Sequence, residues 1–483
     1  MIPALPEIFL AVITLALLML GVFQKPDSGK NSKASDFISL LSVIALALTL
    51  LLVTTITGGK HISFSGMFVA DQFAVFFKCL ILIASALSIV IAKQFQAGHG
   101  IARFEYAILI LFATLGMMLM ISANDLISLY MGLELQSLSL YVLAAFQRDD
   151  SRSSEAGLKY FVLGALASAM LLYGSSLIYG FAGTTNFDTL ASLFHTPGAH
   201  GPSVGLIIGI VFILAGLAFK VSAVPFHMWT PDVYEGAPTP VTAFFSTAPK
   251  LAAMALFIRV MIGPFGDLVQ HWQQIVVFVS IASMLLGAFG AIMQKNIKRL
   301  MAYSSIGHVG YGLIGLAVGN QLGVRSLIIY MAIYLFMNLG AFACILTMRR
   351  GGRMVENIDD LAGFAKTHPM VACAMTIFMF SMAGIPPLAG FIGKLYIFMA
   401  AVDSGLYALA IIGVLTSVVG SFYYLRVIKV MYFEKPGDSL DSPISRDIGA
   451  VILGAGLVIL LLIFYPDPII SSAGAAAEAL FSG

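Results

Sequence analysis

The chain alternates between long apolar stretches and short polar segments from one end to the other. About 20 apolar residues are enough for one helix to cross a bilayer, and fourteen stretches approach or exceed that length. These stretches lie near residues 5–23, 37–57, 74–92, 105–121, 124–146, 158–182, 204–226, 241–262, 270–293, 299–318, 325–347, 369–402, 405–432 and 448–465. The pattern predicts an all-α polytopic membrane protein with about fourteen transmembrane helices.

Two of the predicted spans, the seventh and the twelfth, carry signs of a broken helix. The stretch 369–402 is too long for one straight span and contains two consecutive prolines, Pro386 and Pro387, which interrupt helices. Residues 219–226 of the seventh span are similar to residues 380–387 of the twelfth. Interrupted helices five spans apart indicate two repeats of five helices, and an odd number of spans inverts the second repeat.

The repeat suggests four regions along the chain. A three-helix segment comes first, the two inverted repeats follow as spans 4–8 and 9–13, and a last helix ends the chain. The corresponding boundaries are residues 1–100, 101–265, 266–435 and 436–483.

Composition supports a membrane protein and excludes other classes. Of 483 residues, 59% are hydrophobic and 10% are charged, whereas a soluble chain carries about 25% charged residues. A soluble enzyme, a nucleic-acid binder and a disordered scaffold are therefore excluded. Cys79, Cys344 and Cys373 lie singly in apolar stretches, so neither a metal site nor a cluster is expected. The first span carries Glu7 and lacks a basic leader, so we expect a retained helix and not a cleaved signal.

Basic residues predict the orientation of the spans, because short cytoplasmic loops retain Lys and Arg. The even-numbered loops contain Lys60 and Arg325, and Arg259 lies at a helix end. The odd-numbered loops contain Lys25, Lys30, Lys33, Lys93, Arg103, Arg148, Arg152, Lys295, Lys298, Arg299, Arg349, Arg350, Arg353, Lys366, Lys429, Lys435 and Arg446. We therefore expect the odd loops in the cytoplasm and both termini on the periplasmic side.

Among the charged residues inside predicted spans, four stand out: Glu134, Lys220, Lys250 and Lys394. A charge in the middle of a span costs about 2.5–3.5 kcal/mol on insertion scales, so these residues should face a polar, partly hydrated interior. A buried lysine holds its proton more tightly when a carboxylate is near, and moving the two charges would load or unload the proton. This arrangement favours a proton path. The alternative is a salt bridge between Glu134 and one lysine that only fixes helix packing, which leaves the other lysines unexplained.

Three further residues are ambiguous from the sequence alone. His308 lies among small and hydroxyl residues, where it would serve either as a proton relay or as a hydrogen-bonded packing residue. Lys78 and Lys159 lie about one turn inside their spans, from where long side chains reach the membrane surface. We expect a structural role for Lys78 and leave Lys159 open between a structural role and the relay.

The charged motifs resemble those of the antiporter-like membrane subunits of respiratory complex I, the proton-pumping NADH:quinone oxidoreductase. The resemblance covers essentially all 483 residues and is most specific in segments 130–143, 217–250 and 384–394. It implies that helices 4–8 and 9–13 form two half-channels. It also implies that Glu134 and Lys220 form a modulating pair, that Lys250 is the central shuttle and that Lys394 lies on the exit side.

The resemblance also implies partners and a location. The chain itself would bind no cofactor, because NADH, FMN, iron–sulfur clusters and quinone belong to other subunits of the complex. Its partners would be other membrane-arm subunits, among them a neighbouring antiporter-like subunit, in a bacterial inner membrane. Two features favour one branch of the family. The chain stops soon after the fourteenth span, without a long lateral helix, and Lys394 stands where another branch would carry a glutamate.

Two other functions are compatible with a membrane protein of this kind. One is a subunit of a multi-subunit sodium/proton antiporter of related fold. Glu134 is the only clear carboxylate in the middle of a span, and sodium prefers oxygen ligands, so the sequence disfavours sodium transport. The other is a purely scaffolding membrane subunit, which predicts that the lysines inside the spans can be replaced without loss of function.

Overall fold

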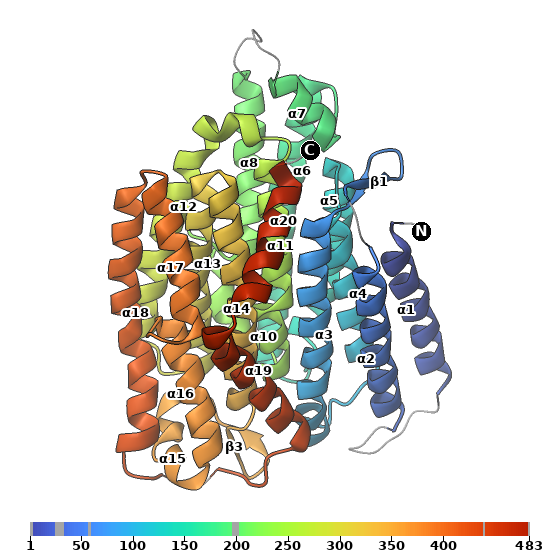
Figure 1. Cartoon of the computed structure of the whole chain (residues 1–483). Coiled ribbons are helices and arrows are strands. Elements are labelled where there is room, and N and C mark those ends of the chain that lie inside the picture. The colour runs from blue at the N-terminus through green and yellow to red at the C-terminus, as the bar shows by residue number, and fades with distance from the viewer. Residues whose placement is uncertain (1–2, 25–32, 57–58, 196–201, 438–439, 482–483) are drawn as a thin grey trace.

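The computed structural model describes residues 3–24, 33–56, 59–195, 202–437 and 440–481. Lys25 and Lys30, two of the basic residues that predict the orientation, lie outside the described residues. Figure 1 shows a bundle of mostly upright helices, with the N-terminal helices at one edge of the view and α18 (Tyr407–Phe433) at the other.

The first hundred residues form three long helices and one hairpin. The helices are α1 (Leu5–Phe23), α2 (Lys33–Thr54) and α3 (Gln72–His99). The strands β1 (His61–Ser63) and β2 (Phe68–Ala70) pair antiparallel between α2 and α3. The side chain of Asp71 accepts a hydrogen bond of 2.7 Å from the backbone N–H of Ala74 and so caps α3.

The next two regions contain the spans that carry the charged residues. Region 101–265 contains α4 (Glu105–Ile121), α5 (Leu126–Ala144), α6 (Ser151–Ala182), α7 (Phe187–His195), α8 (Val204–Val221), α9 (Trp229–Gly236), α10 (Thr239–Ser246) and α11 (Ala248–Ile262). Region 266–435 contains the 3-10 turn η1 (Gly266–Leu268), α12 (Val269–Ile292), α13 (Ile297–Val318), α14 (Gln321–Ile345), β3 (Arg349–Arg350), β4 (Arg353–Met354), the 3-10 turn η2 (Ile358–Leu361), α15 (Phe364–Thr367), α16 (Pro369–Ala383), α17 (Ala389–Asp403) and α18.

The C-terminal region holds two helices where the sequence indicates one. The predicted fourteenth span corresponds to α19 (Arg446–Phe464), and α20 (Asp467–Phe481) follows it. α20 packs against α3 and α14, which belong to distant parts of the chain, and crosses the front of the bundle in Figure 1. Its 15 residues are too few for a full span, which is why hydropathy alone does not find it.

The all-α membrane fold is confirmed. Among the described residues, 11 helical segments are long and apolar enough to cross a membrane. The fourth and twelfth predicted spans give the shorter apolar helices α4 and α16, and the tenth gives α13, a helix of 22 residues. The exact number of fourteen spans therefore stays a prediction, and so do the four region boundaries.

Both predicted helix breaks are present, and the eighth span contains a third. α8 ends at Ser222, which has a left-handed φ of 66°, and α16 ends at Gly384, with φ of 82°. The third break separates α10 from α11 at Thr247, where φ is −116° and ψ is −94°. Pro249 follows in the first turn of α11, where a missing N–H is tolerated. Lys220, Lys394 and Lys250 thus each lie close to a broken helix, where backbone groups are free to meet polar side chains.

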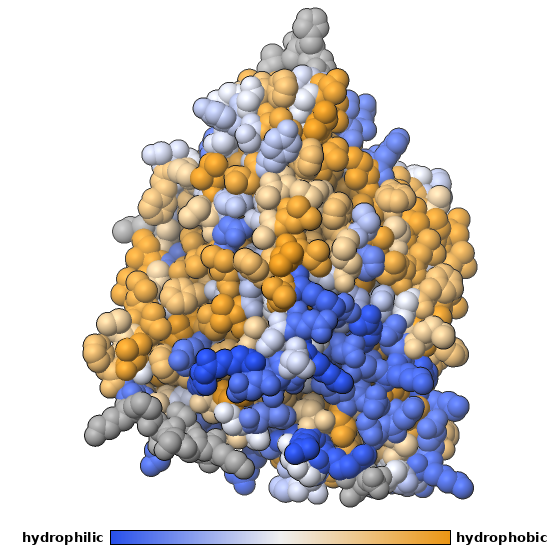
Figure 2. Space-filling model, turned by 180° about the vertical axis from the view of Figure 1, so that it is seen from behind, coloured by the Kyte–Doolittle hydropathy of each residue, from blue (hydrophilic) through white to orange (hydrophobic). Residues whose placement is uncertain are grey.

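The two ends of the bundle differ in which loops they hold. In Figure 1 the start of α1, the hairpin strand β1, helix α7 and the end of α20 lie at the upper end, and β3 and α15 lie at the lower end. On the face seen in Figure 2, hydrophobic residues cover most of the height of the molecule, and hydrophilic residues gather towards the lower end. The even-numbered loops that contain β1 and α7 thus lie at one end of the bundle, and the odd-numbered loop that contains β3 and α15 lies at the other. This is the alternation on which the prediction from basic residues depends.

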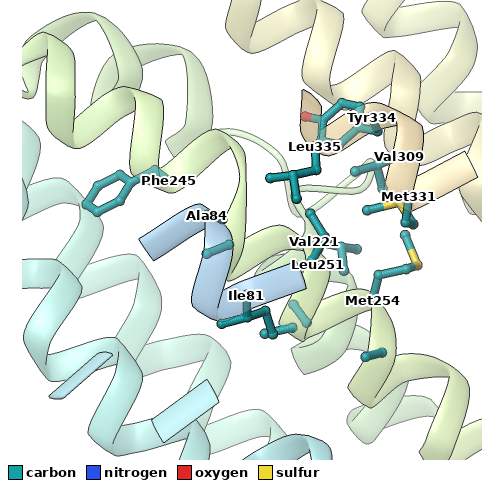
Figure 3. Packing of buried hydrophobic residues seen from close by; sticks show 14 of the residues in the cluster. Ile81, Ala84, Val221, Phe245, Leu251, Met254, Val309, Met331, Tyr334 and Leu335 are labelled. Atoms are coloured by element: carbon teal, nitrogen blue, oxygen red, sulfur yellow. The ribbon is translucent and has the colours of Figure 1, made fainter. Parts of the chain in front are cut away.

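The centre of the core brings α3, α11, α13 and α14 together. Figure 3 shows Ile81 of α3, Leu251 and Met254 of α11, Val309 of α13 and Met331 of α14 in one packed group, each at most 2% exposed. Lys250 precedes Leu251, so this packing carries the lysine into the middle of the protein and next to α13.

Candidate functional site

Lys250 lies in the first turn of α11 and is 2% exposed. Its Nζ donates a hydrogen bond to the hydroxyl of Ser305 on α13, and it lies 5.4 Å from the ring centre of Tyr234 on α9. The hydroxyl of Ser305 is 2.7 Å from that of Tyr334 on α14. A lysine in this place is therefore surrounded by hydroxyl and aromatic groups from three other helices, which can solvate its charged form.

His308 lies three residues after Ser305 on α13, on the same face of the helix. It is 2% exposed, and both ring nitrogens have hydroxyl partners. Nδ1 is 2.5 Å from the hydroxyl of Tyr330 on α14, and Nε2 is 3.0 Å from that of Tyr424 on α18. A neutral imidazole donates from one nitrogen and accepts at the other, so this ring is placed to receive a proton on one side and release one on the other.

Lys394 lies on α17 and points at the end of the preceding half-helix. Its Nζ donates to the carbonyl oxygens of Met382 at 2.9 Å and Ala383 at 3.0 Å, and to the hydroxyl of Ser417 at 2.8 Å. The two carbonyls are among the last of α16, which have no partner inside the helix and attract a cation. Gly384 leaves room for this contact, because a Cβ there would lie 3.2 Å from the Lys394 Nζ.

A small cavity joins the surroundings of His308 and Lys394. Its volume is about 10 Å³, and its lining includes both residues together with Tyr311, Ser417 and Tyr424. A cavity of this size holds about one water molecule when polar groups surround it. His308 and Lys394 therefore lie within reach of a single bridging water.

Glu134 and Lys220 lie near each other but are not in direct contact. Glu134 accepts a hydrogen bond from the hydroxyl of Ser168 on α6, and Lys220 donates to the hydroxyl of Ser137 at 2.6 Å. Ser137 lies on the same face of α5 as Glu134, three residues further along. Both charged side chains are half-buried, and each has its own serine hydroxyl as a partner in place of the direct ion pair that the sequence predicts.

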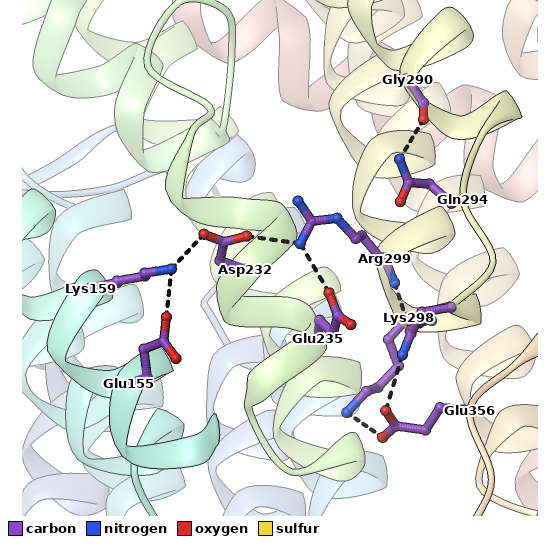
Figure 4. A network of polar contacts seen from close by, with 10 residues as sticks. Glu155, Lys159, Asp232, Glu235, Gly290, Gln294, Lys298, Arg299 and Glu356 are labelled. Carbon is purple, nitrogen blue, oxygen red and sulfur yellow. Dashed lines mark hydrogen bonds and ion pairs between the residues drawn. The ribbon is translucent and has the colours of Figure 1, made fainter. Parts of the chain in front are cut away.

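Lys159 lies outside this buried set. Its side chain is 41% exposed and forms ion pairs with Glu155 and Asp232, each at 2.8 Å. Figure 4 shows these contacts as part of a network that also includes Arg299 of α13. Burial alone would raise the pKa of the Asp232 carboxyl, but hydrogen bonds from Lys159 and Arg299 outweigh burial and hold that pKa below its usual value.

The expectation that the Lys78 side chain reaches towards the membrane surface is wrong. Its side chain is 1% exposed, and its Nζ lies 2.5 Å from a carboxylate oxygen of Glu7 on α1. The carboxylate on α1 gives the lysine a partner inside the bundle, which removes the need to reach water. Lys78 thus serves to join α1 to α3, which agrees with the structural role expected for it.

The hydroxyl residues of the site are not evident from the sequence. The main ones are Ser137, Ser168, Ser304, Ser305, Ser417, Tyr330, Tyr334 and Tyr424. Tyrosines in an apolar helix are equally compatible with packing, and their partners lie on other helices. The one usable signal is the hydroxyl-rich run around His308, where serines precede the histidine by one turn.

Comparison with known proteins identifies the class. Residues 123–420 match the model of the family described as NADH:quinone oxidoreductase/Mrp antiporter, TM. The chain belongs to this family of antiporter-like membrane subunits. It is 59% identical over 485 residues to NADH-quinone oxidoreductase subunit N of Paramagnetospirillum magneticum, covering 100% of this chain and 98% of that relative. The branch of the family that the sequence favours is confirmed by this relative.

Solved structures agree with this placement. Respiratory complex I from Thermus thermophilus with bound aureothin contains a chain with a TM-score of 0.82 and 32% identity, covering 98% of this chain and 100% of that one. The Mrp complex from Dietzia sp. gives a TM-score of 0.86 at 24% identity, covering 100% of this chain and 98% of that one. At this identity the second match shows a shared fold and nothing more. Complex I and the Mrp complex both contain this fold, so the fold alone does not distinguish a complex I subunit from an Mrp subunit.

Proposed function

We propose that this chain is a proton-translocating membrane subunit of an NADH:quinone oxidoreductase, and that protons pass through it along Glu134, Lys220, Lys250, His308 and Lys394. The observation that carries the proposal is the closeness of two groups of hydroxyl contacts: Lys250 bonds to Ser305 and Ser305 to Tyr334. The ring of Tyr334 lies 5.3 Å from that of His308, and one small cavity is lined by both His308 and Lys394. Electron transfer from NADH to quinone in other subunits supplies the energy for the transport.

The second half of the path runs through His308. A proton leaving Lys250 passes by the hydroxyls of Ser305 and Tyr334, whose ring lies 5.3 Å from that of His308, and His308 accepts it from the hydroxyl of Tyr330. Such hydroxyls both donate and accept, so they pass a proton on without changing charge. The small cavity next to His308 leads to Lys394, whose carbonyl partners at the break in the twelfth span favour the charged form.

Glu134 and Lys220 act as the modulating pair of the first half. The negative charge of Glu134, one helical turn from the Ser137 hydroxyl that accepts from Lys220, stabilises the charged form of this lysine. A change in their separation alters how firmly Lys220 holds its proton. Lys159, exposed and paired with two carboxylates, is assigned to a supporting network and not to the path itself.

Partly exposed charged groups inside the membrane indicate where a partner subunit covers this chain. Glu134 is half-buried in the middle of α5, and Lys220 is half-buried in the last turn of α8, at the break in its span. Contact of either charge with lipid would be costly there. A neighbouring antiporter-like subunit of the membrane arm covers them in the assembled complex. The chain itself binds no cofactor, and it lies in a bacterial inner membrane with both termini in the periplasm.

Sodium transport is the competing proposal, because the Mrp complex shares the fold. Along the proposed path Glu134 is the single carboxylate, and the other charged groups are lysines. Sodium needs several oxygen ligands and gains nothing from ammonium groups. Co-purification with a flavin-containing, NADH-oxidising assembly is the expected result, and purification with a sodium-dependent antiporter assembly would overturn the proposal.

Glu134→Gln is expected to leave assembly intact and to lower NADH-driven proton pumping by up to about tenfold, because a nearby charge changes a proton equilibrium by about that factor. Pumping is measured as acidification in vesicles that contain the purified complex. Glu105→Gln, at the start of the neighbouring helix α4, is the matched control and should pump normally. Failure to assemble, with normal pumping in the surviving complexes, would show that Glu134 has a structural role.

The topology is testable with single cysteines. Arg353→Cys, on the exposed strand β4, should react with an impermeant thiol reagent only from the cytoplasmic side. Lys60→Cys, at the other end of the bundle, should react only from the periplasm. Both are made in a background with Cys79→Ser and Cys373→Ser, since Cys79 is partly exposed and Cys373 is exposed, whereas Cys344 is buried. Labelling of position 353 in intact cells would reverse the orientation.

A further inference from the structure

α9 is the short helix that links the break after Lys220 to the span that carries Lys250. One face of α9 is buried, with Trp229 at 3% and Tyr234 at 0% exposure. The Nε1 of Trp229 donates to the carbonyl of Phe219 at 3.1 Å, across the break between α8 and α9. The position of α9 therefore depends on contacts on both sides of the break.

The other face of α9 carries acidic residues that lie three positions apart, Asp232 and Glu235. Oδ2 of Asp232 is 2.8 Å from the Nζ of Lys159 on α6, and Oδ1 is 2.8 Å from Nη1 of Arg299 on α13. The same guanidinium nitrogen lies 2.9 Å from Glu235. Figure 4 shows Asp232 between the two cations, so one carboxylate is shared by helices from the two predicted repeats.

These ion pairs are not placed to contribute much stability. The side chains of Lys159, Asp232 and Arg299 are 41%, 36% and 31% exposed, and ion pairs that water reaches add little to the free energy of unfolding. Their geometry fixes a position instead. The two oxygens of Asp232 point to opposite neighbours, so the carboxylate sets the distance of α9 from both α6 and α13.

We propose that Asp232 is a positioning residue for proton transfer: its shared carboxylate fixes α9 between α6 and α13 and thereby holds Tyr234 beside Lys250. Tyr234 follows Asp232 by two residues, on the buried side of the helix, and its ring centre lies 5.4 Å from the Lys250 Nζ. An aromatic ring at this distance stabilises the charged lysine. The inference rests on the proposed function, because it concerns how Lys250 is held during transfer.

The side chain that replaces Asp232 decides the outcome. Asparagine keeps the shape but carries one acceptor oxygen and an NH₂ group, which would face a cation and cannot bond to it. Asp232→Asn therefore loses one of the two links and the charge that serves both. Glutamate keeps the charge and both oxygens, so Asp232→Glu should restore much of the function.

The test compares variants in the assembled, purified complex in vesicles, with the amount of complex and the rate of NADH oxidation measured alongside. Asp232→Asn should reduce protons pumped per NADH by about threefold or more, and Asp232→Glu should recover at least half of the loss. The matched control is Asp188→Asn at the opposite end of the bundle. Asp188 also bonds to two partners, Lys60 at 2.6 Å and Asn124 at 2.7 Å, and this variant should pump normally.

Wild-type pumping per NADH in Asp232→Asn would overturn the inference, and so would a variant that only lowers the amount of assembled complex. An equal loss of pumping in the Asn and Glu variants would also contradict the inference, because a carboxylate at position 232 would then not support pumping. Lys250→Ala is measured in parallel. Normal pumping in Lys250→Ala refutes the proposed function itself, whereas loss in Lys250→Ala with normal Asp232→Asn refutes the positioning role alone.

Discussion

A complex that carries Lys250→Ala is expected to lose NADH-driven proton pumping by about tenfold or more, with quinone reduction slowed as well. The lysine supplies the titrating group next to Ser305, and alanine removes that group, so that the Ser305 hydroxyl keeps its contact with Tyr334 but has no proton source at position 250. Lys250→Arg should rescue poorly, because arginine keeps a charge but does not give up its proton in proteins. Pumping and quinone reduction are measured on the same vesicle preparation, after assembly has been checked.

The matched control removes a buried lysine that lies outside the path. Lys78 is as deeply buried as Lys250 and pairs with Glu7. The double variant Lys78→Met, Glu7→Gln replaces both partners, which avoids an unpaired buried charge, and should pump normally. Full activity in Lys250→Ala would exclude Lys250 as an obligatory proton carrier.

Lys394→Arg is expected to impair pumping about as strongly as Lys394→Ala, by about tenfold. A guanidinium can still donate to the carbonyls of Met382 and Ala383, so the break in the twelfth span keeps its cation. Proton exchange at this position is lost in both variants. The measurement is NADH-driven acidification in reconstituted vesicles, normalised to the quantity of assembled complex.

Two further results distinguish proton exchange at Lys394 from a role as a fixed charge. Lys366→Arg, in the short helix α15 before the broken span, should pump normally and shows that a Lys-to-Arg change is tolerated nearby. Normal pumping in Lys394→Arg together with loss in Lys394→Ala would show that this position supplies charge and not proton exchange.

Much of the fold follows from hydropathy, because a membrane span leaves a long apolar stretch in the sequence. The two paired breaks were also predictable, since proline marks both of them in similar segments. The break at Thr247 was less evident because α10 and α11 together read as one apolar span of 24 residues. α20 was missed for the opposite reason: it is short and rich in alanine, and its place against α3 and α14 depends on contacts between distant segments.

The charged residues of the site were easier to find than their partners. A charge inside an apolar span stands out, which singles out Glu134, Lys220, Lys250 and Lys394 from the sequence. Which groups face them depends on helix rotation and on neighbours far away in the chain, and sequence spacing does not fix either. The serine partners of Glu134 and Lys220 therefore could not be foreseen, and neither could the partner of Lys78 on α1.

The ion pair between Asp71 and Arg259 limits how this chain can be divided or recombined. Asp71 caps α3 in the N-terminal segment, and both of its oxygens bond to the guanidinium of Arg259 at the end of α11, at 2.8 and 2.9 Å. Both side chains are at most 6% exposed. A truncation that removes the first helices would strand a buried guanidinium, at a cost of about 3–5 kcal/mol. A chimera that exchanges residues 1–100 with a relative should assemble only where the donor segment supplies an acid at position 71.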